Sequence, residues 1–302
     1  MIHVAPVPAS FDDRGLDTLA QSLGGWPPPE RLLLDARGTT WASPYGLAAL
    51  LTLGQSIKEL GLPRPKFAAP DSDDTRGYWA RTGFFAYAAE YYDLVGKIPR
   101  RSSEAASDTL LPLTPIRDAE DVHEVVGKLQ EVATRILTSE LKLEAKATMG
   151  FAMALSEACQ NVVEHAETGG WVAAQTYFWK RRLGRKVAVI AVSDGGIGFR
   201  RSLEATEAKK VGERWGDGAA LESAVLHSVS RFRDKEKGRG QGIAGIKRYI
   251  FRWHGKLSVR SGSARIALLP EWDDDVPLAE HLPFFPGAQL QLTIPAQEAV
   301  SR

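Results

Sequence analysis

The sequence predicts an α/β protein of two domains, and three observations support this. The chain has 302 residues, 44% of them hydrophobic, which is enough to fill a core in each of two ordinary domains. Strand-like and helix-like segments are interspersed in both halves. Between the halves, residues 96–118 contain three prolines and scattered serines, a composition typical of a linker. We therefore expect domains at 1–95 and 119–302.

The N-terminal half is predicted to be a small α/β domain. Residues 31–36 form a short apolar run typical of a buried strand, and 44–60 form a helix with Pro44 in its first turn. The sequence Gly61-Leu62-Pro63 then ends that helix. A second apolar run at 66–69 and a second helix from Ser72 continue the alternation.

The C-terminal half is predicted to combine helices with a β-hairpin and further strands. Apolar residues at 122–137 recur at helical spacing, and another helix is expected over 142–166. Residues 171–179 and 186–193 are strand-like and are separated by a basic turn, so they are expected to pair as a hairpin. Helices at 219–229 and 241–253 and strands at 256–260, 265–269 and 289–294 complete the expected order.

The composition indicates which classes of partner and which cellular compartment to expect. With 38 basic and 37 acidic side chains, the formal charge of +1 gives no overall field that would recruit nucleic acid or a membrane surface. The single cysteine, Cys159, cannot form an internal disulfide and suits a reducing compartment. No apolar run has the roughly 20 residues of a membrane-spanning helix, and residues 1–10 do not resemble a signal peptide. We expect a soluble, cytoplasmic protein that binds neither nucleic acid nor membranes.

Glu157 and Asn161 lie four residues apart in a predicted helix, so their side chains share one face. A carboxamide oxygen is a suitable ligand for Mg²⁺, and a carboxylate beside it can accept a proton from an attacking water or hydroxyl. A solvated helix face gives the same spacing. This segment alone leaves both interpretations open.

Asp194 ends a predicted buried strand and precedes three glycines in four positions, Gly195, Gly196 and Gly198. Without Cβ atoms in the way, such a turn lets the backbone approach a ligand closely. The Asp194 carboxylate can accept a hydrogen bond from an exocyclic amine, as adenine offers. A tight turn capped by the aspartate is the alternative.

Gly238, Gly240 and Gly242, with Arg239 between the first two, lead into the helix expected at 241–253. Glycines at a helix start allow several N–H groups to converge on an anion, and the helix dipole favours negative charge there. This predicts a phosphate cradle. No GxxxxGK[ST] string occurs, and no strand directly precedes the glycines, so neither a Walker loop nor a Rossmann unit is indicated.

The order of these motifs is more specific than any one of them. It resembles the GHKL ATPase superfamily of gyrase, the large heat-shock chaperone, histidine kinases and MutL. The strings SEACQNVVEHA, VSDGGIGF and GRGQGIAGIK are most similar to the anti-sigma-factor serine kinase branch. The resemblance covers residues 120–295 and implies a two-layer α/β sandwich of the Bergerat type that binds ATP and Mg²⁺.

The resemblance also implies a role for each matching residue. Glu157 would be the general base, Asn161 the Mg²⁺ ligand, and Asp194 the group that recognises the adenine amine. Gly196 and Gly198 would line the nucleotide and hinge a lid over 199–238. The amides of Gly240 and Gly242 would bind the phosphates, where Arg239 could add charge.

Two departures from the family pattern stand out. The closing strand of the family usually begins with Gly-Thr, whereas here Gly287 is followed by Ala288, so one hydroxyl contact near adenine is missing. Residues 270–286 are additional material, rich in Asp, Pro and Phe, without a chemical role in this scheme.

The N-terminal half more weakly resembles the STAS domain of anti-sigma-factor antagonists, over RLLLDARGTTWASPYGLAALLTLGQSIKELG. In that family the loop before the helix carries a serine that partner kinases phosphorylate. Tyr45 stands at that position here, so the usual phosphorylation is not implied. Ser43 could still serve, although a serine at the start of a helix usually caps it.

Two functions follow as expectations. The first is an enzyme that transfers the γ-phosphoryl group of ATP to water or to a protein serine or threonine, a choice the residues leave open. The second is a nucleotide-gated binding module with little turnover. Its protein partner would be its own STAS-like domain or another regulator, and a homodimer is compatible with the resemblance.

Overall fold

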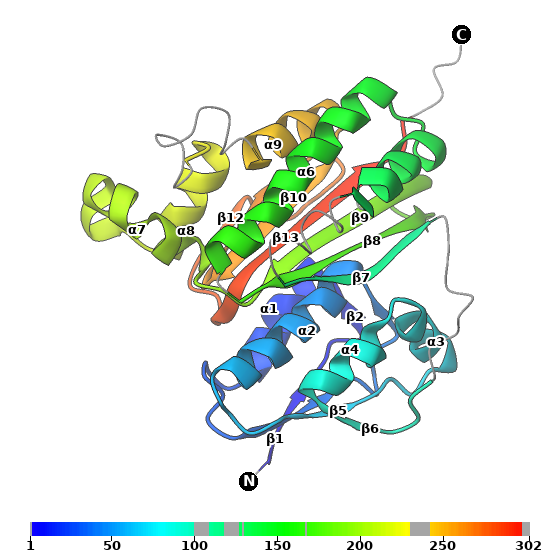
Figure 1. Cartoon of the computed structure of the whole chain (residues 1–302), viewed down its shortest axis with the longest axis vertical. Helices are drawn as coiled ribbons and strands as arrows, with labels where there is room; N and C mark the ends of the chain where they lie inside the picture. The colour runs from blue at the N-terminus through cyan, green and yellow to red at the C-terminus, as the bar shows by residue number, and fades with distance from the viewer. Residues whose placement is uncertain are drawn as a thin grey trace.

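The computed structural model describes residues 2–99, 109–117, 127–128, 130–166, 168–229 and 242–297, without the side chains of 161–166. Its fold is mixed α/β, which confirms the predicted class at that level. A small parallel sheet occupies the N-terminal part, and a larger antiparallel sheet occupies the C-terminal part (Figure 1). Within the described residues, no helix combines the length and apolar character needed to cross a membrane.

The N-terminal part contains a four-stranded parallel sheet in the order β1-β3-β5-β6, with a short parallel pair, β2 and β4, beside it. Its elements are β1 (Ile2–Pro6), β2 (Ser10–Phe11), α1 (Asp13–Ser22), β3 (Arg31–Asp35), β4 (Trp41–Ala42), α2 (Pro44–Glu59), β5 (Lys66–Ala68), α3 (Asp73–Arg81), α4 (Phe84–Tyr91) and β6 (Asp93–Val95). The strand and both helices predicted after residue 30 are present, whereas β1 and α1 had no clear sequence signal.

Helix α2 is the centre of this part. Ser43 caps it by accepting a hydrogen bond from the Gly46 amide at 3.2 Å, as predicted, and Pro44 occupies its first turn. Thirteen of its 16 residues are buried. A helix buried on nearly all sides needs cover on both faces, and α2 has it because it lies between the two sheets (Figure 1).

The C-terminal part contains a seven-stranded sheet in the order β12-β11-β10-β13-β9-β8-β7, and every adjacent pair is antiparallel. The strands are β7 (Leu110–Ile116), β8 (Gly170–Trp179), β9 (Arg185–Asp194), β10 (Lys256–Gly262), β11 (Ala264–Leu268), β12 (Leu278–Ala279) and β13 (Phe285–Pro295). The helical segments are η1 (Ile136–Glu140), α6 (Ala145–Ala166), α7 (Gly198–Val211), η2 (Gly212–Arg214), α8 (Asp217–Leu221), η3 (Glu222–Leu226) and α9 (Gly242–Arg252). The predicted hairpin of β8 and β9 is confirmed. Strand β7 lies within the stretch that we expected to be a linker.

The two faces of the large sheet serve different neighbours. On β9, the side chains of Ala188, Ile190 and Val192 enter the core beneath α6 and α9, whereas Ala191 belongs to the core shared with α2. This alternation is the period of two expected of a strand. Asp194 continues the first series, so its side chain lies on the α6 face.

Helices α6 and α9 pack closely because glycines remove side chains from their contact. A Cβ atom placed on Gly245 would lie 2.8 Å from the Cβ of Ala154, and one placed on Gly150 would collide with the Tyr249 hydroxyl. Gly245 of α9 and Gly150 of α6 therefore set the spacing of the two helices.

The opposite face of the sheet is covered by the N-terminal part. Trp171, Ala173 and Ala191 from the large sheet share one hydrophobic core with α2. Polar contacts add to this packing: the hydroxyls of Thr52 and Ser193 are 2.8 Å apart and buried, and the Trp171 indole donates to Gln55 at 3.1 Å. The two halves are thus joined by a packed interface.

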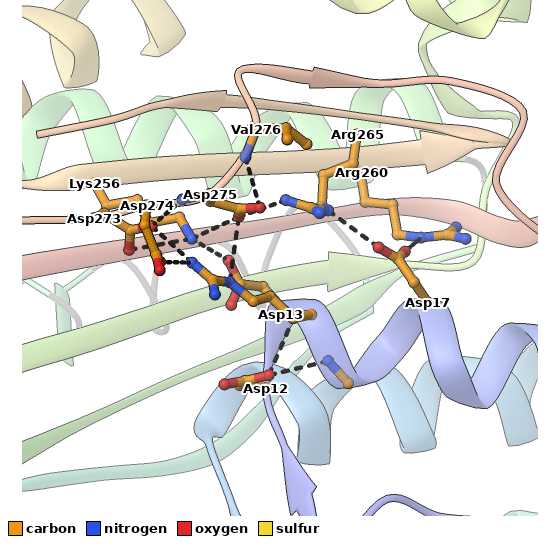
Figure 2. Close-up of polar contacts among 12 residues, drawn as sticks. Asp12, Asp13, Asp17, Lys256, Arg260, Arg265, Asp273, Asp274, Asp275 and Val276 are labelled. Atoms are coloured by element: carbon orange, nitrogen blue, oxygen red, sulfur yellow. Dashed lines mark hydrogen bonds and ion pairs between the residues drawn. The ribbon is translucent and has the colours of Figure 1, made fainter.

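Beside this apolar contact lies a cluster of ion pairs between α1, β10, β11 and the 270–286 segment (Figure 2). Asp17 of α1 binds Arg260 at 2.9 Å and Arg265 at 3.2 Å. Asp275 binds Lys256 at 2.9 Å and Arg265 at 2.6 Å. These side chains are buried or nearly so. The additional segment therefore has a structural role that the motif pattern did not reveal: it holds the cations that α1 also binds.

The basic turn between β8 and β9 takes part in the same cluster. Arg182 binds Asp273 at 3.1 Å and lies over the rings of Trp179 and Trp272. The Arg182 side chain remains 38% exposed, so it joins the cluster from its solvent side.

Candidate functional site

Asp194 is the last residue of β9, opposite Gly170 of β8 and Ala288 of β13. Its carboxylate accepts a hydrogen bond from the Gly196 amide at 2.9 Å. Burial raises the pKa of Asp194 from 3.8 to about 7, although hydrogen bonds from the amides of Gly196 and Ala288 act in the other direction. The side chain is still partly accessible.

This environment bears on the two interpretations of Asp194. The bond to Gly196 is the turn that a purely structural aspartate would also make. A structural cap, however, gains nothing from a carboxylate that is costly to ionise. A desolvated yet accessible acid at a strand end is a candidate for ligand binding.

Steric constraints explain why glycine is required near Asp194. Gly198 has φ +70°, in the left-handed region that favours glycine, and it opens α7. Gly287 has φ +73°, and a Cβ atom there would lie 1.9 Å from the carbonyl oxygen of Asp194. The start of β13 can therefore lie against the Asp194 turn only with glycine at 287. Gly196 contributes its amide, as described above.

Glu157 and Gly242 are neighbours in space. A Cβ atom placed on Gly242, the first residue of α9, would lie 3.4 Å from both Cβ and Cγ of Glu157. The side chain of Glu157 is partly accessible, and Gly242 is buried. The structure thus brings the predicted base to the N-terminus of the predicted phosphate-binding helix.

Chain connectivity directs the end of α6 toward Asp194. Helix α6 ends at Ala166, and only a few residues later β8 begins at Gly170, directly opposite Asp194. Glu157 lies nine residues before the end of that helix, roughly 14 Å at 1.5 Å per residue. Helix α6 therefore leads from Glu157 toward the strand end that carries Asp194.

The other predicted site residues are described only in part. Asn161 lies on α6, one turn beyond Glu157, but its side chain is outside the described part of the chain. Arg239 and Gly240 are likewise outside the described residues. Within the described residues, no group of three or more His, Cys, Asp or Glu side chains could hold a metal ion.

One residue near Asp194 in the sheet could not be identified from the sequence. Ser261 of β10 is buried, and its hydroxyl accepts a hydrogen bond from the Phe199 amide and donates one to the Gly287 carbonyl, both at 3.1 Å. The partners are 62 and 26 residues away. No local pattern marks a serine that acts over such separations.

A scan against protein-family models and searches of curated proteins and of solved structures give no match for this chain. The family resemblance rests on the motifs and their order.

Proposed function

We propose that residues 119–302 bind Mg-ATP, with adenine at Asp194 and the phosphates between Glu157 and the start of α9. The observation that carries the proposal is the contact between Gly242 and Glu157. It brings together two motifs that lie 85 residues apart in sequence.

The adenine end has an acceptor and a shaped turn. Asp194 is partly accessible on the α6 face, and its carboxylate would accept a hydrogen bond from the adenine amine. Gly196 and Gly198 keep the adjacent backbone free of side chains. The proposed two-layer sandwich agrees with the position of α6 and α9 on this one face of the antiparallel sheet (Figure 1).

The phosphate end has a helix N-terminus and a carboxylate. Helix α9 has 11 residues, and its first-turn amides, which have no partner within the helix, would attract phosphate oxygens together with the helix dipole. Gly242 contributes no side chain at that point. In the proposal, Gly240 and Arg239 extend this cradle, and Asn161, one turn from Glu157, ligates the Mg²⁺ that neutralises the triphosphate.

Glu157 would then act on the nucleophile. A carboxylate beside the terminal phosphate can take the proton from an attacking oxygen as the bond to the γ-phosphorus forms and the ADP oxygen leaves. The attacking group is water or a protein serine or threonine hydroxyl. Both reactions need the same arrangement of metal, phosphate and base.

Incubation with γ-labelled ATP and Mg²⁺ distinguishes these reactions. Label on a protein identifies a kinase, and free labelled phosphate identifies an ATPase. The Glu157→Ala variant should bind ATP with near-normal affinity and lose transfer, whereas Glu144→Ala, which removes an exposed carboxylate paired with Arg252, should leave transfer unchanged. Unchanged transfer in Glu157→Ala would show that Glu157 is not the base.

A second function has its own support: the N-terminal part, proposed to be STAS-like, is a built-in partner of the nucleotide site. Helix α2 contacts β8, β9 and β13, and a Cβ atom on Gly195 would lie 2.4 Å from the Ser56 hydroxyl of α2. Residues on both sides of Asp194 thus touch this helix. Nucleotide at Asp194 would change how α2 is held, with or without turnover.

In this proposal the N-terminal part is not switched by phosphorylation at the usual place. Tyr45 and Ser43 are both buried in the folded chain, and Ser43 already caps α2. The gating idea is tested by hydrogen exchange of α2 with Mg-ATP, with Mg-ADP and without nucleotide. Identical exchange in all three conditions would contradict it.

A further inference from the structure

Ser261 links three segments at the Asp194 edge of the sheet. Its hydroxyl accepts a hydrogen bond from the Phe199 amide, a first-turn N–H of α7 that has no partner within its own helix. The same hydroxyl donates a hydrogen bond to the Gly287 carbonyl. Gly287 in turn lies against the Asp194 carbonyl. One buried hydroxyl therefore connects the start of α7 to the strands that carry and flank Asp194.

The sheet register places Ser261 in line with Asp194. Ser261 pairs with Ala288, and Ala288 pairs with Asp194, so the three residues form one row across β10, β13 and β9. Residues directly opposite each other in a ladder have side chains on the same face. The Ser261 hydroxyl thus lies on the same face of the sheet as Asp194. It is one strand beyond Ala288, the position at which the family that the chain resembles usually carries threonine.

Space around Ser261 is adapted to this contact. A Cβ atom on Gly198 would lie 2.6 Å from the Ser261 hydroxyl and 3.3 Å from the Gly287 carbonyl. Glycine at 198 is therefore needed not only for its positive φ but also to let the serine approach the backbone. The segment expected to act as a lid is therefore fixed at its first residue, Phe199, and at the Gly198 hinge.

We propose that Ser261 is a positioning residue for nucleotide binding: its hydroxyl fixes the Gly198 hinge and the Gly287 turn so that Asp194 meets adenine in one geometry. The inference rests on the proposed function. Because Ser261 acts at the adenine end, its loss should weaken ATP and ADP equally. The phosphate end, at Glu157 and α9, should be unaffected.

The test is calorimetric titration of the full chain with Mg-ATP and Mg-ADP. Ser261→Ala should weaken both nucleotides by roughly five- to tenfold, since two backbone groups lose a buried partner. Ser261→Thr, which keeps the hydroxyl, should restore most of the affinity. Ser258→Ala is the matched control: Ser258 is a fully buried serine of the same strand, outside this row, and its affinity should be unchanged.

The outcomes separate this proposal from the proposed function. If the unmodified chain binds neither nucleotide, the proposed function is wrong and the role of Ser261 falls with it. If the unmodified chain binds but Ser261→Ala has normal affinity, only the role of Ser261 is wrong. A lower melting temperature with unchanged affinity would show that the serine merely stabilises the fold, and a loss restricted to ATP would contradict its place at the adenine end.

Discussion

The Asp194→Asn substitution should make the protein more stable and at the same time weaken its affinity for ATP. The pKa of Asp194 rises from 3.8 to about 7 on folding because the carboxylate is buried. The folded state therefore holds a proton that the unfolded chain releases between these values, and the free energy of unfolding decreases as the pH rises from about 3.8 to about 7 and then levels off. An amide of the same shape has no such titration.

The size of the effect follows from the shift. Three pH units at 1.36 kcal/mol each give a maximum of about 4 kcal/mol above pH 7. At pH 5 the same shift gives less than half of this, and partial exposure of the side chain lowers both values. We expect the variant to gain about 1–3 kcal/mol at pH 8 and clearly less at pH 5. The Gly196 amide can still bond to the amide oxygen.

Urea unfolding at pH 5 and pH 8 measures this gain, and calorimetry measures the affinity for Mg-ATP. The amide nitrogen would direct its hydrogens toward the adenine amine, and loss of a bond to a charged acceptor costs about 1.5–3 kcal/mol, at least a tenfold weaker affinity. Asp71→Asn, at an exposed position, should change neither quantity. A variant that gains no stability at pH 8, or that binds ATP normally, would refute the reasoning about Asp194.

Two further predictions concern the interface with the N-terminal part. Gly195→Ala should destabilise the chain by about 1 kcal/mol because its Cβ would lie 2.4 Å from the Ser56 hydroxyl. Adding Ser56→Ala should recover most of this loss. If the two substitutions have strictly additive effects on the free energy of unfolding in urea, the contact is contradicted. Asp275→Asn should cost about 3 kcal/mol at pH 7, because Lys256 and Arg265 lose a shared buried partner. Burial raises the pKa of Asp275, but hydrogen bonds from Lys256 and Arg265 outweigh it and hold the pKa well below 3.8. The stabilisation by Asp275 should therefore be present above pH 3.8 and be lost as the pH falls further. An acid-unfolding curve identical to that of the unmodified chain would show that this pair is not stabilising.

The elements of this fold were predictable where local chemistry determines them. Helix α2 follows from Ser43, Pro44 and an apolar run, and the hairpin of β8 and β9 follows from its alternation and its turn. Strand β7 was not predictable because its prolines resemble a linker, and it is a strand only as the edge partner of β8. An edge strand tolerates proline where a central strand does not.

The candidate site likewise has a part that local sequence predicts and a part that it does not. Asp194, its glycines and Glu157 could be identified because their residue types and spacing indicate their chemistry directly. The contact of Gly242 with Glu157 and the links made by Ser261 depend on packing between distant segments, which no local pattern encodes. The ion pairs of the 270–286 segment were hidden for the same reason: their cations lie on β10 and β11, and α1 supplies a second set of carboxylates.

The central claim, that this chain binds Mg-ATP, is tested most directly by titrating the 302-residue chain with a non-hydrolysable ATP analogue and Mg²⁺ while following heat and melting temperature. We predict saturable binding to one site per chain, and at 100 times Kd a stabilisation of about 2.7 kcal/mol, which raises the melting temperature by several degrees. At the same nucleotide concentration, the Asp194→Asn variant should bind at least tenfold more weakly and gain only about 1.4 kcal/mol or less. A flat calorimetric trace and an unchanged melting temperature at millimolar nucleotide would contradict the account.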